Sequence, residues 1–360
     1  MKEREYLIAI CSFLPFGPIR TKLLIQYFSG AKNVWLAKEK DLINVGISKQ
    51  LVLSFLKHRN EFNPDNFFTK LTKLSINTVT FNDKNYPSNL VGLDDSPLVL
   101  YHLGKLQDSD VDSIAIVGSR KVTSYGKEVT KMIASELCTC GIAIVSGLAF
   151  GVDLEAHKNT LDVGGRCIAV LASGVDMITP RSNEWLGRKI ISSGGVIISE
   201  YPPGTIPQKQ FFPYRNRIIS GISKAVVVIE GEIKSGTIHT ASHAAKQGRT
   251  VFAVPGQITS LNSGAPHYLI QNGARPLFSV KDILDELNFE MKLEKRGVEK
   301  LMPTDKKELE LYKILENEPL HIDEIARISS MSIKDVSVKL MVMELKGLIK
   351  NFGNSIYKKA

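Results

Sequence analysis

Short runs of Val, Ile and Ala recur along the middle of the chain, and they constrain its fold more than any other feature. Continuous apolar runs of this length are typical of strands covered on both faces, as in a parallel sheet. Helical patterns separate most of the runs; in one, Val129, Ile133 and Leu137 share a stripe that ends at Gly141. The alternation predicts an α/β fold with a Rossmann-like, doubly wound, mainly parallel sheet over residues 111–285. The runs are SIAIVGS, IAIVSG, CIAVLAS, GVIISE, AVVVIE and TVFAVPG.

Residues 1–75 show helical periodicity and no strand alternation. Two apolar-Gly-apolar turns, Phe16-Gly17-Pro18 and Val45-Gly46-Ile47, each lead into an amphipathic run. This pattern predicts a helical domain of SAM or helix-hairpin-helix type. The backbone N–H groups of such turns can bind a phosphate, as helix N-termini do. A small helical bundle that only packs or pairs is the alternative.

The C-terminal part of the chain divides into a linker and a small domain. Residues 286–303 are charged and poor in aromatic residues, which is typical of a linker. Residues 304–360 predict three helices followed by a hairpin around Gly353 and Asn354, which together make a winged helix. The charges of this part nearly balance, so we do not expect it to read a DNA sequence.

The composition indicates what kind of binding partner and which cellular compartment to expect. The net charge is +9 and the pI about 9.2, values that suit an anionic partner. The four cysteines show no paired spacing and are expected as reduced thiols in a cytoplasmic protein. The apolar stretch YLIAICSFLPFGP follows Glu3 and Glu5 and predicts an amphipathic helix rather than a signal peptide. No apolar run approaches the roughly 20 residues of a membrane span, so no membrane partner is expected.

The loops that follow the strands are the places to look for a ligand, because open α/β sheets bind ligands at the carboxyl ends of their strands. The first strand is followed by Gly118, Ser119 and Arg120, and the second by the glycine-containing loop 146–157. Arginine offers a planar fork of donors that suits a phosphate. Residues 234–237, Lys-Ser-Gly-Thr, stand at the start of a later helix, which is another seat for an anion.

The segment KQFFPYRNR, residues 209–217, places three cationic side chains among three rings directly before a strand. Cations can follow a phosphate chain, and rings can stack on unpaired bases. The structural alternative is that Phe211 and Tyr214 belong to the core and that Arg217 pairs with a carboxylate such as Glu200. We expect at least one ring and one arginine of the segment to be structural.

Signatures of catalysis and of metal binding are weak. The chain has no GxGxxG, GxxxxGK[ST], GxSxG or HExxH pattern. His239 and His243 are spaced for one helix face but have no accompanying carboxylate, so a packed helix is expected there. Asp153 and His157 share this spacing and are expected to fix a loop and a helix start. We therefore predict no catalytic residue, no metal and no cofactor.

At these motifs the sequence closely resembles the DNA-processing protein A family (DprA, also called Smf). The resemblance covers nearly the whole chain and rests on IAIVGSRKVTSYG, IVSGLAFGVDLEAH, IISEYPPG, FFPYRNRIISGIS, VVVIEGEIKSGTIHTASHAAKQGR and LIQNGA, with YPSNL and PLVLYHLGK ahead of them. It implies that residues 76–110 link the helical domain to the core and pack on it. One departure is Thr179, where family members usually carry Tyr before the proline.

The resemblance also implies a function without catalysis. The family binds incoming single-stranded DNA during natural transformation, protects it and loads a RecA-type recombinase on it, usually as a homodimer formed through the Rossmann-like domain. Carried over by motif, the residues that contact DNA are Arg120, Lys209, Phe212, Arg215 and Arg217. The residues that form the phosphate seat are Gly118, Ser119, Ser235, Gly236 and Thr237.

Two other functions remain open from the sequence. The α/β core also resembles the lysine-decarboxylase-like phosphoribohydrolases, which carry a GGxGTxxE motif. Gly236 and Thr237 match that motif, but Thr240 stands where its glutamate would fall, which removes a group for acid–base chemistry. A transcription regulator that acts through the winged helix is the second alternative.

Overall fold

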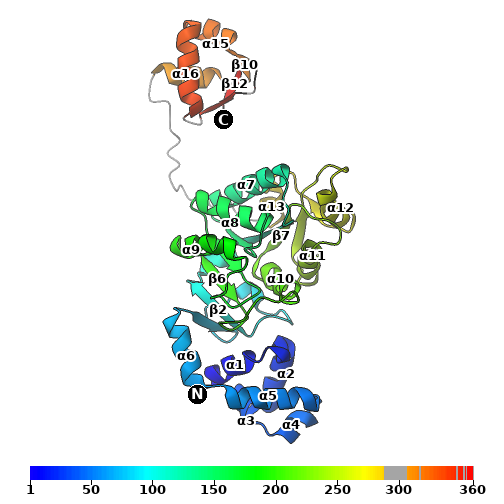
Figure 1. Cartoon of the computed structure of the whole chain (residues 1–360). Coiled ribbons are helices and arrows are strands. Elements are labelled where there is room, and N and C mark those ends of the chain that lie inside the picture. The colour runs from blue at the N-terminus through cyan, green and yellow to red at the C-terminus, as the bar shows by residue number, and fades with distance from the viewer. Residues whose placement is uncertain (288–305, 316–317, 346–347, 352, 354, 360) are drawn as a thin grey trace. The chain divides into compact units, whose positions relative to one another are not determined.

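The computed structural model describes residues 1–287, 306–315, 318–345, 348–351, 353 and 355–359. The chain forms two compact units, Met1–Lys292 and Leu293–Ala360 (Figure 1). The linker that we expect over residues 286–303 lies almost wholly outside the described residues.

The larger unit is built on one nine-stranded sheet with the order β1-β2-β6-β5-β4-β3-β7-β8-β9. The pairs from β6 through β9 are parallel, whereas β1 and β2 are antiparallel to each other and β2 is antiparallel to β6. The prediction of a mainly parallel, doubly wound sheet is therefore confirmed. The strands are β1 (Asn77–Thr80), β2 (Val99–Gly104), β3 (Ser113–Val117), β4 (Ala143–Ser146), β5 (Cys167–Val170), β6 (Val196–Ser199), β7 (Ala225–Val228), β8 (Thr250–Ala253) and β9 (Arg275–Pro276).

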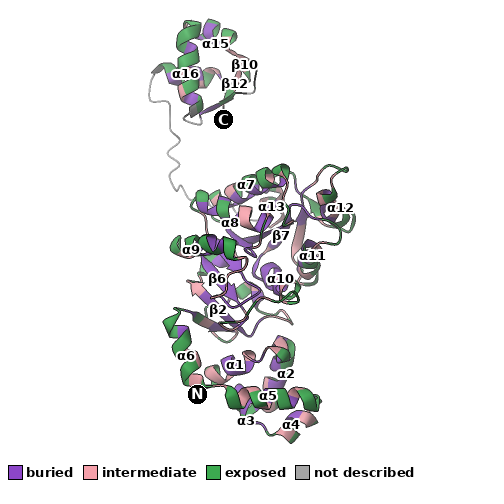
Figure 2. Cartoon of the chain, in the orientation of Figure 1, coloured by how far each residue is buried: buried purple, intermediate pink, exposed green. Residues whose placement is uncertain are grey.

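Helices cover both faces of this sheet, and the alternation of apolar residues along each strand explains why. In β3, Ile114 and Ile116 pack with α7 (Ser124–Thr139), α8 (Val152–Asp162) and α13 (Val280–Glu286). Ala115 and Val117 point to the other face and share a core with α10 (Phe211–Ile222), α11 (Gly236–Lys246) and α12 (Gly264–Gln271). Helix α9 (Glu184–Ser192) covers β5 and β6. Figure 2 shows the strands β6 and β7 buried while the helices expose their outer faces.

The N-terminal helices form a bundle that packs on the antiparallel end of the sheet. Phe13, Phe16, Trp35 and Phe55 meet in its centre, with ring centroids 4.7 to 5.8 Å apart. The same apolar cluster includes Tyr101 of β2, so the bundle and the sheet share one core. The helices are α1 (Glu3–Cys11), α2 (Gly17–Phe28), α3 (Ala31–Leu36), α4 (Glu39–Asn44), α5 (Lys49–Glu61) and α6 (Pro64–Lys73).

The segment 76–110 does more than pack against the core, because it contributes the strands β1 and β2 to the sheet. Sequence reasoning missed both strands. Strand β2 has the apolar residues expected of a buried strand. However, it runs antiparallel to β6 and lies outside the alternation of strands and helices that marks the rest of the sheet.

The smaller unit has the architecture of a winged helix. Helices α14 (Lys306–Ile314), α15 (Ile322–Ser329) and α16 (Ile333–Leu345) enclose a core that includes Leu311, Ile325 and Leu340. A three-stranded antiparallel sheet of the order β10-β12-β11 completes it. Its strands are β10 (Leu320–His321), β11 (Ile349–Asn351) and β12 (Ile356–Lys359).

The apolar N-terminal stretch forms α1, which buries Leu7, Ile8, Ala9 and Ile10. Within the described residues, no single helix has the length and apolar character of a membrane span. The segments Glu3–Cys11 and Leu14–Phe28 meet that test only as a pair, across a bend of 80°.

We expect Ile116→Ala to lower the free energy of unfolding of the larger unit by about 2–5 kcal/mol, because the side chain is fully buried and its loss leaves a cavity in the sheet core. Met132→Ala on the exposed face of α7 should change it by less than about 0.5 kcal/mol. Both tryptophans of the chain, Trp35 and Trp185, lie in this unit. Urea unfolding of the full chain followed by tryptophan fluorescence therefore measures this unit alone. Equal effects of the two substitutions would contradict the core assignment.

Candidate nucleic-acid interface

The candidate site lies where the direction of strand order reverses. From β3 the chain proceeds to β4, β5 and β6 on one side, and then crosses to β7, β8 and β9 on the other. In a doubly wound sheet this switch point leaves a crevice at the carboxyl ends of the two strands. The loops after β3 and β7 meet there, since the Ser119 N–H donates to the Glu230 carbonyl oxygen at 2.7 Å. A Cβ added to Gly118 would lie 2.6 Å from Val152 Cγ2, so only glycine allows this close approach.

Two predicted DNA-contacting residues, Arg120 and Phe212, meet at the rim of this crevice. The Arg120 guanidinium carbon lies 5.2 Å from the centroid of the Phe212 ring, within the range of a cation–π contact. Arg120 is exposed in the loop after β3, and Phe212 is half-buried in the first turn of α10. Lys209 is exposed in the turn directly before that helix. A surface cation over a ring that is only partly covered leaves both groups available to a ligand.

The predicted phosphate seat at Ser235, Gly236 and Thr237 lies at the N-terminus of α11. The Ser235 hydroxyl is buried, forms no cap bond to the helix and has no hydrogen-bond partner among the described residues. A Cβ at Gly231 would lie 2.9 Å from Ser235 Oγ and 3.2 Å from Thr237 Oγ1, so both hydroxyls lie beside this glycine. Free N–H groups and the helix dipole favour an anion here.

Arg215 is enclosed and binds the backbone of the sheet. Its Nη1 donates to the Gly147 carbonyl oxygen at 3.0 Å and to the Val170 carbonyl oxygen, so it ties α10 to the loop after β4 and to the end of β5. A Cβ at Gly147 would lie 2.4 Å from Arg215 Nη2; glycine is required to admit the guanidinium. Burial lowers the pKa of Arg215 to about 10, and the attraction of Asp153 opposes this shift.

Asp153 holds the loop after β4 from the inside. Its Oδ2 accepts hydrogen bonds from the Gly147 N–H at 3.1 Å and the Ala149 N–H at 3.4 Å. Burial raises the pKa of Asp153, while the nearby charge of Arg215 acts to lower it. Asp153 thus fixes the loop and the start of α8, as the sequence indicated.

Arg217 is also buried, at 2% exposure, and its Nη2 forms an ion pair with Glu200. This is the carboxylate that the structural alternative named. Burial alone would lower the pKa of Arg217, but Glu200 and Tyr214 outweigh it and the pKa is raised. Direct DNA contacts from Arg215 and Arg217 would require both guanidinium groups to leave these partners. In the structure they position α10 instead.

The rings of residues 209–217 also divide into structural and surface ones. Phe211 stacks on Tyr201, with ring centroids 4.4 Å apart and ring planes 26° from parallel. It therefore packs the start of α10 against the segment that follows β6. Tyr214 is 39% exposed and lies with its ring 4.1 Å from the Arg217 guanidinium carbon. Tyr214 is therefore a surface ring rather than the core ring that the alternative proposed.

Sequence reasoning missed two residues that shape the site. Glu230 accepts hydrogen bonds from the Thr123 N–H at 2.9 Å and from the Thr123 hydroxyl, which fixes the start of α7. Asn216 donates to the Gly236 carbonyl oxygen at 3.4 Å and so joins α10 to the phosphate seat. In the sequence, an acidic residue close after the buried strand β7 could have pointed to Glu230.

The same loops bear on catalysis and metal binding. Thr240, in place of a phosphoribohydrolase glutamate, is buried in α11. Over the described ranges, no group of three His, Cys, Asp or Glu side chains is placed to hold a metal ion.

The architecture and the loops at the switch point define a Rossmann-like α/β protein that carries a helical N-terminal module, with a winged helix as its second unit. The chain belongs to the DNA recombination-mediator protein A family, whose sequence model matches residues 77–288. The DprA winged helix domain matches residues 299–351. This is a family of recombination mediators, so the chain is not an enzyme of the phosphoribohydrolase kind.

Relatives and solved structures agree with this assignment. The chain is 33% identical to the protein Smf of Synechocystis over 96% of both chains, and 42% identical to the DNA processing protein DprA of Bacillus subtilis over 62% of this chain and 77% of that one. The crystal structure of DNA processing protein A from Streptococcus pneumoniae matches 79% of this chain and 99% of its own, with 30% identity and a TM-score of 0.68. A structure of DNA processing protein A from Helicobacter pylori, described for its single-stranded DNA binding mode, matches 59% of this chain and 95% of its own, with 30% identity and a TM-score of 0.52.

We expect Arg215→Met to lower the free energy of unfolding of the larger unit by about 3–5 kcal/mol, because it leaves the buried Asp153 without its compensating charge. Arg120→Met, a matched change at an exposed arginine, should alter it by less than about 0.5 kcal/mol. Tryptophan fluorescence during urea unfolding again provides the measurement. If both variants were equally stable, Arg215 would not have the positioning role that its contacts indicate.

Proposed function

We propose that this protein binds single-stranded DNA along the rim formed by Arg120, Lys209 and Phe212. The observation that supports this most directly is the Arg120 guanidinium over the partly exposed Phe212 ring, 5.2 Å from its centroid. Such a pair offers a phosphate contact and a stacking surface at one point. The Helicobacter pylori relative, whose structure is described for single-stranded DNA binding, supports the same ligand.

The strand's phosphates would bind at the glycine and hydroxyl groups behind this rim, at Gly118, Ser119 and residues 235–237. Backbone N–H groups and hydroxyls bind phosphate without regard to the base, and a ring stacks on any base. Binding is therefore expected to be largely independent of sequence and to prefer single strands over duplex, whose bases are already stacked.

The bound strand would then be protected and passed to a RecA-type recombinase during natural transformation. Membership of the recombination-mediator family supports the delivery step. The rival function, a duplex-binding regulator acting through the winged helix, predicts sequence-selective binding that depends on residues 304–360.

We expect Phe212→Ala to weaken binding to single-stranded DNA by about 1–3 kcal/mol, through the loss of one stacked base, with little change in salt dependence. Arg120→Ala and Lys209→Ala should each weaken binding and reduce the slope of log affinity against log salt by about 0.7, because each loses one phosphate contact. Fluorescence anisotropy with a labelled oligonucleotide across a salt series measures both quantities.

Lys131→Ala is the matched control for these variants, since Lys131 is an exposed lysine of α7 on the opposite face of the sheet from α10. It should bind like the wild type. If Arg120→Ala and Lys209→Ala also bind like the wild type at moderate salt, the site is wrongly placed. Stronger binding of duplex DNA by the wild type would favour the regulator.

A homodimer is part of this proposal, and we place its surface at the exposed apolar residues beyond β8 and β9. Ile258 and Leu261 are 91% and 83% exposed after β8, and Phe278 is 75% exposed after β9. The two strands pair in parallel, with Ala253 opposite Pro276, so these residues follow the same edge of the sheet. Exposed apolar groups gathered in this way are typical of a protein interface.

We expect Leu261→Asp and Ile258→Asp to shift the protein from dimer to monomer, since a buried carboxylate without a partner opposes association. Light scattering after size-exclusion chromatography measures the shift. Val163→Asp, at an exposed position after α8, should leave the dimer intact. A monomeric wild type would refute the dimer; dimeric variants would refute only this choice of surface.

A further inference from the structure

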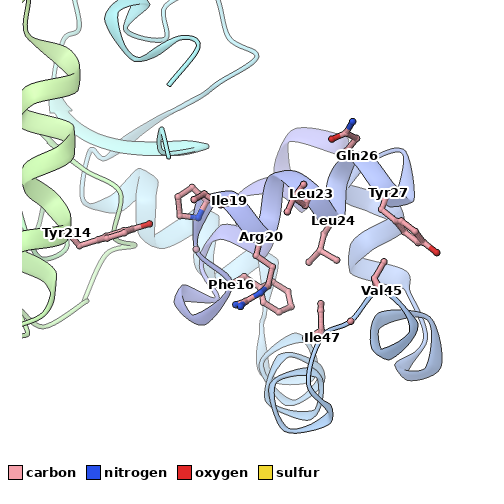
Figure 3. A pocket seen from close by; sticks show the side chains of 13 residues that line it. Phe16, Ile19, Arg20, Leu23, Leu24, Gln26, Tyr27, Val45, Ile47 and Tyr214 are labelled. Atoms are coloured by element: carbon pink, nitrogen blue, oxygen red, sulfur yellow. The ribbon is translucent and has the colours of Figure 1, made fainter. Parts of the chain in front are cut away.

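A groove on the N-terminal domain opens beside the proposed DNA-binding rim. It has a volume of about 840 Å³ and lies between α2, the turn around Gly46 and Tyr214 of α10. Both apolar-Gly-apolar turns that stand out in the sequence line it. Figure 3 shows Tyr214 reaching from α10 toward α2, with Leu24 and Ile47 facing each other across the groove. A second cavity of about 300 Å³ shares Gly17, Pro18 and Tyr214 with it, so the groove continues inward between the two domains.

The groove is continuous with the rim through α10. Tyr214 lies two residues after Phe212 in α10, which places it about 200° around the helix from Phe212. Its hydroxyl approaches the start of α2, where a Cβ added to Gly17 would lie 3.9 Å away. Gln210 and Phe211, from the same turn as Lys209, line the inner cavity. A strand that leaves Phe212 and passes around the first turn of α10, by Lys209 and Gln210, therefore arrives at this groove.

The side chains of the groove suit unpaired bases. Tyr27 is 65% exposed and Tyr214 is 39% exposed, so rings are available at both ends, with Ile19 and Leu23 between them. Arg20 is the one charged residue among the described residues that line the groove, and it is a cation. Its Nη1 donates to the Pro15 carbonyl oxygen at 2.9 Å, which holds the guanidinium beside the groove and leaves other donors for a phosphate.

The length of the groove fits a few nucleotides. Ile19 and Tyr27 are eight positions apart on α2, which corresponds to about 12 Å at the helical rise of about 1.5 Å per residue. Stacked bases are spaced by about 3.4 Å, so about three bases fit over this distance.

We propose, building on the single-strand binding proposed above, that this groove is a second segment of the DNA track, in which bases stack on Tyr214 and Tyr27 and Arg20 binds the phosphate chain. The N-terminal domain then extends the footprint on DNA by a few nucleotides. An apolar protein helix is the other occupant that such a groove could take, but continuity with α10 and the single positive charge favour the DNA strand.

Two strand lengths test this proposal. A strand of about 4 nucleotides, the lower limit of single-strand sites, should occupy only the rim, whereas one of about 16 nucleotides should reach the groove. In the full-length protein, Tyr27→Ala should weaken binding of the longer strand at least fivefold and that of the shorter strand less than twofold. Tyr27→Phe keeps the ring and should bind both strands like the wild type. Arg20→Gln should reduce the salt slope for the longer strand alone.

Photocrosslinking provides a readout that does not depend on affinity. A 16-nucleotide strand that carries 5-iododeoxyuridine is expected to crosslink to Tyr27 or Tyr214, identified by peptide mass spectrometry. If crosslinks fall only at Phe212 and Tyr27→Ala binds the longer strand normally, the groove is not part of the track, although the rim stands. If Tyr27→Ala instead loses binding of the recombinase with DNA binding intact, the groove takes a protein helix and the proposal is overturned. Failure of the wild type to bind either strand would refute the proposed function itself.

Discussion

Two buried guanidinium groups fix helix α10 against the sheet, and the arrangement of the site depends on them. Arg215 binds carbonyl oxygens directly after β4 and at the end of β5, and Arg217 pairs with Glu200 directly after β6. Burying an arginine is costly unless its charge is matched and its donors are bonded. Glu200 matches the charge of Arg217, and two backbone carbonyl oxygens accept hydrogen bonds from Arg215. With α10 held in this way, its first turn presents Phe212 to Arg120 and turns Tyr214 toward the N-terminal domain.

The same contacts explain which part of the site the sequence could predict. The strands and the loops after them were predictable, because Val and Ile runs and glycines at strand ends are local patterns. The roles of Arg215 and Arg217 were not, since they depend on carbonyl groups and a carboxylate contributed by distant loops. In a sequence, an arginine that binds DNA and one that binds backbone look alike. Two expectations anticipated part of the outcome: the alternative that paired Arg217 with Glu200, and the expectation that at least one ring and one arginine of the segment would be structural.

The strands β1 and β2 show that local sequence patterns were also insufficient to predict the whole fold. Strand β2 buries Tyr101 against the N-terminal helices and hydrogen-bonds to β6, so it belongs to two parts of the structure at once. No local pattern identifies such a strand as the antiparallel continuation of a parallel sheet. Its position also explains why the helical domain shares a core with the sheet, and hence why a groove between α2 and α10 has defined walls.

The two buried arginines also limit how much of the protein's positive charge is available to an anionic ligand at the proposed site. Arg215, with a pKa of about 10, stays charged at neutral pH, but Asp153 and Glu200 lie beside Arg215 and Arg217 and offset their fields. In the proposed site, the attraction for a phosphate chain would therefore come from exposed cations such as Arg120, Lys209 and Lys234 and from the N-terminus of α11. Stacking on rings would add a share of the affinity that does not depend on these charges. On the proposed function, binding would weaken with salt through the phosphate contacts and keep the part that stacking provides.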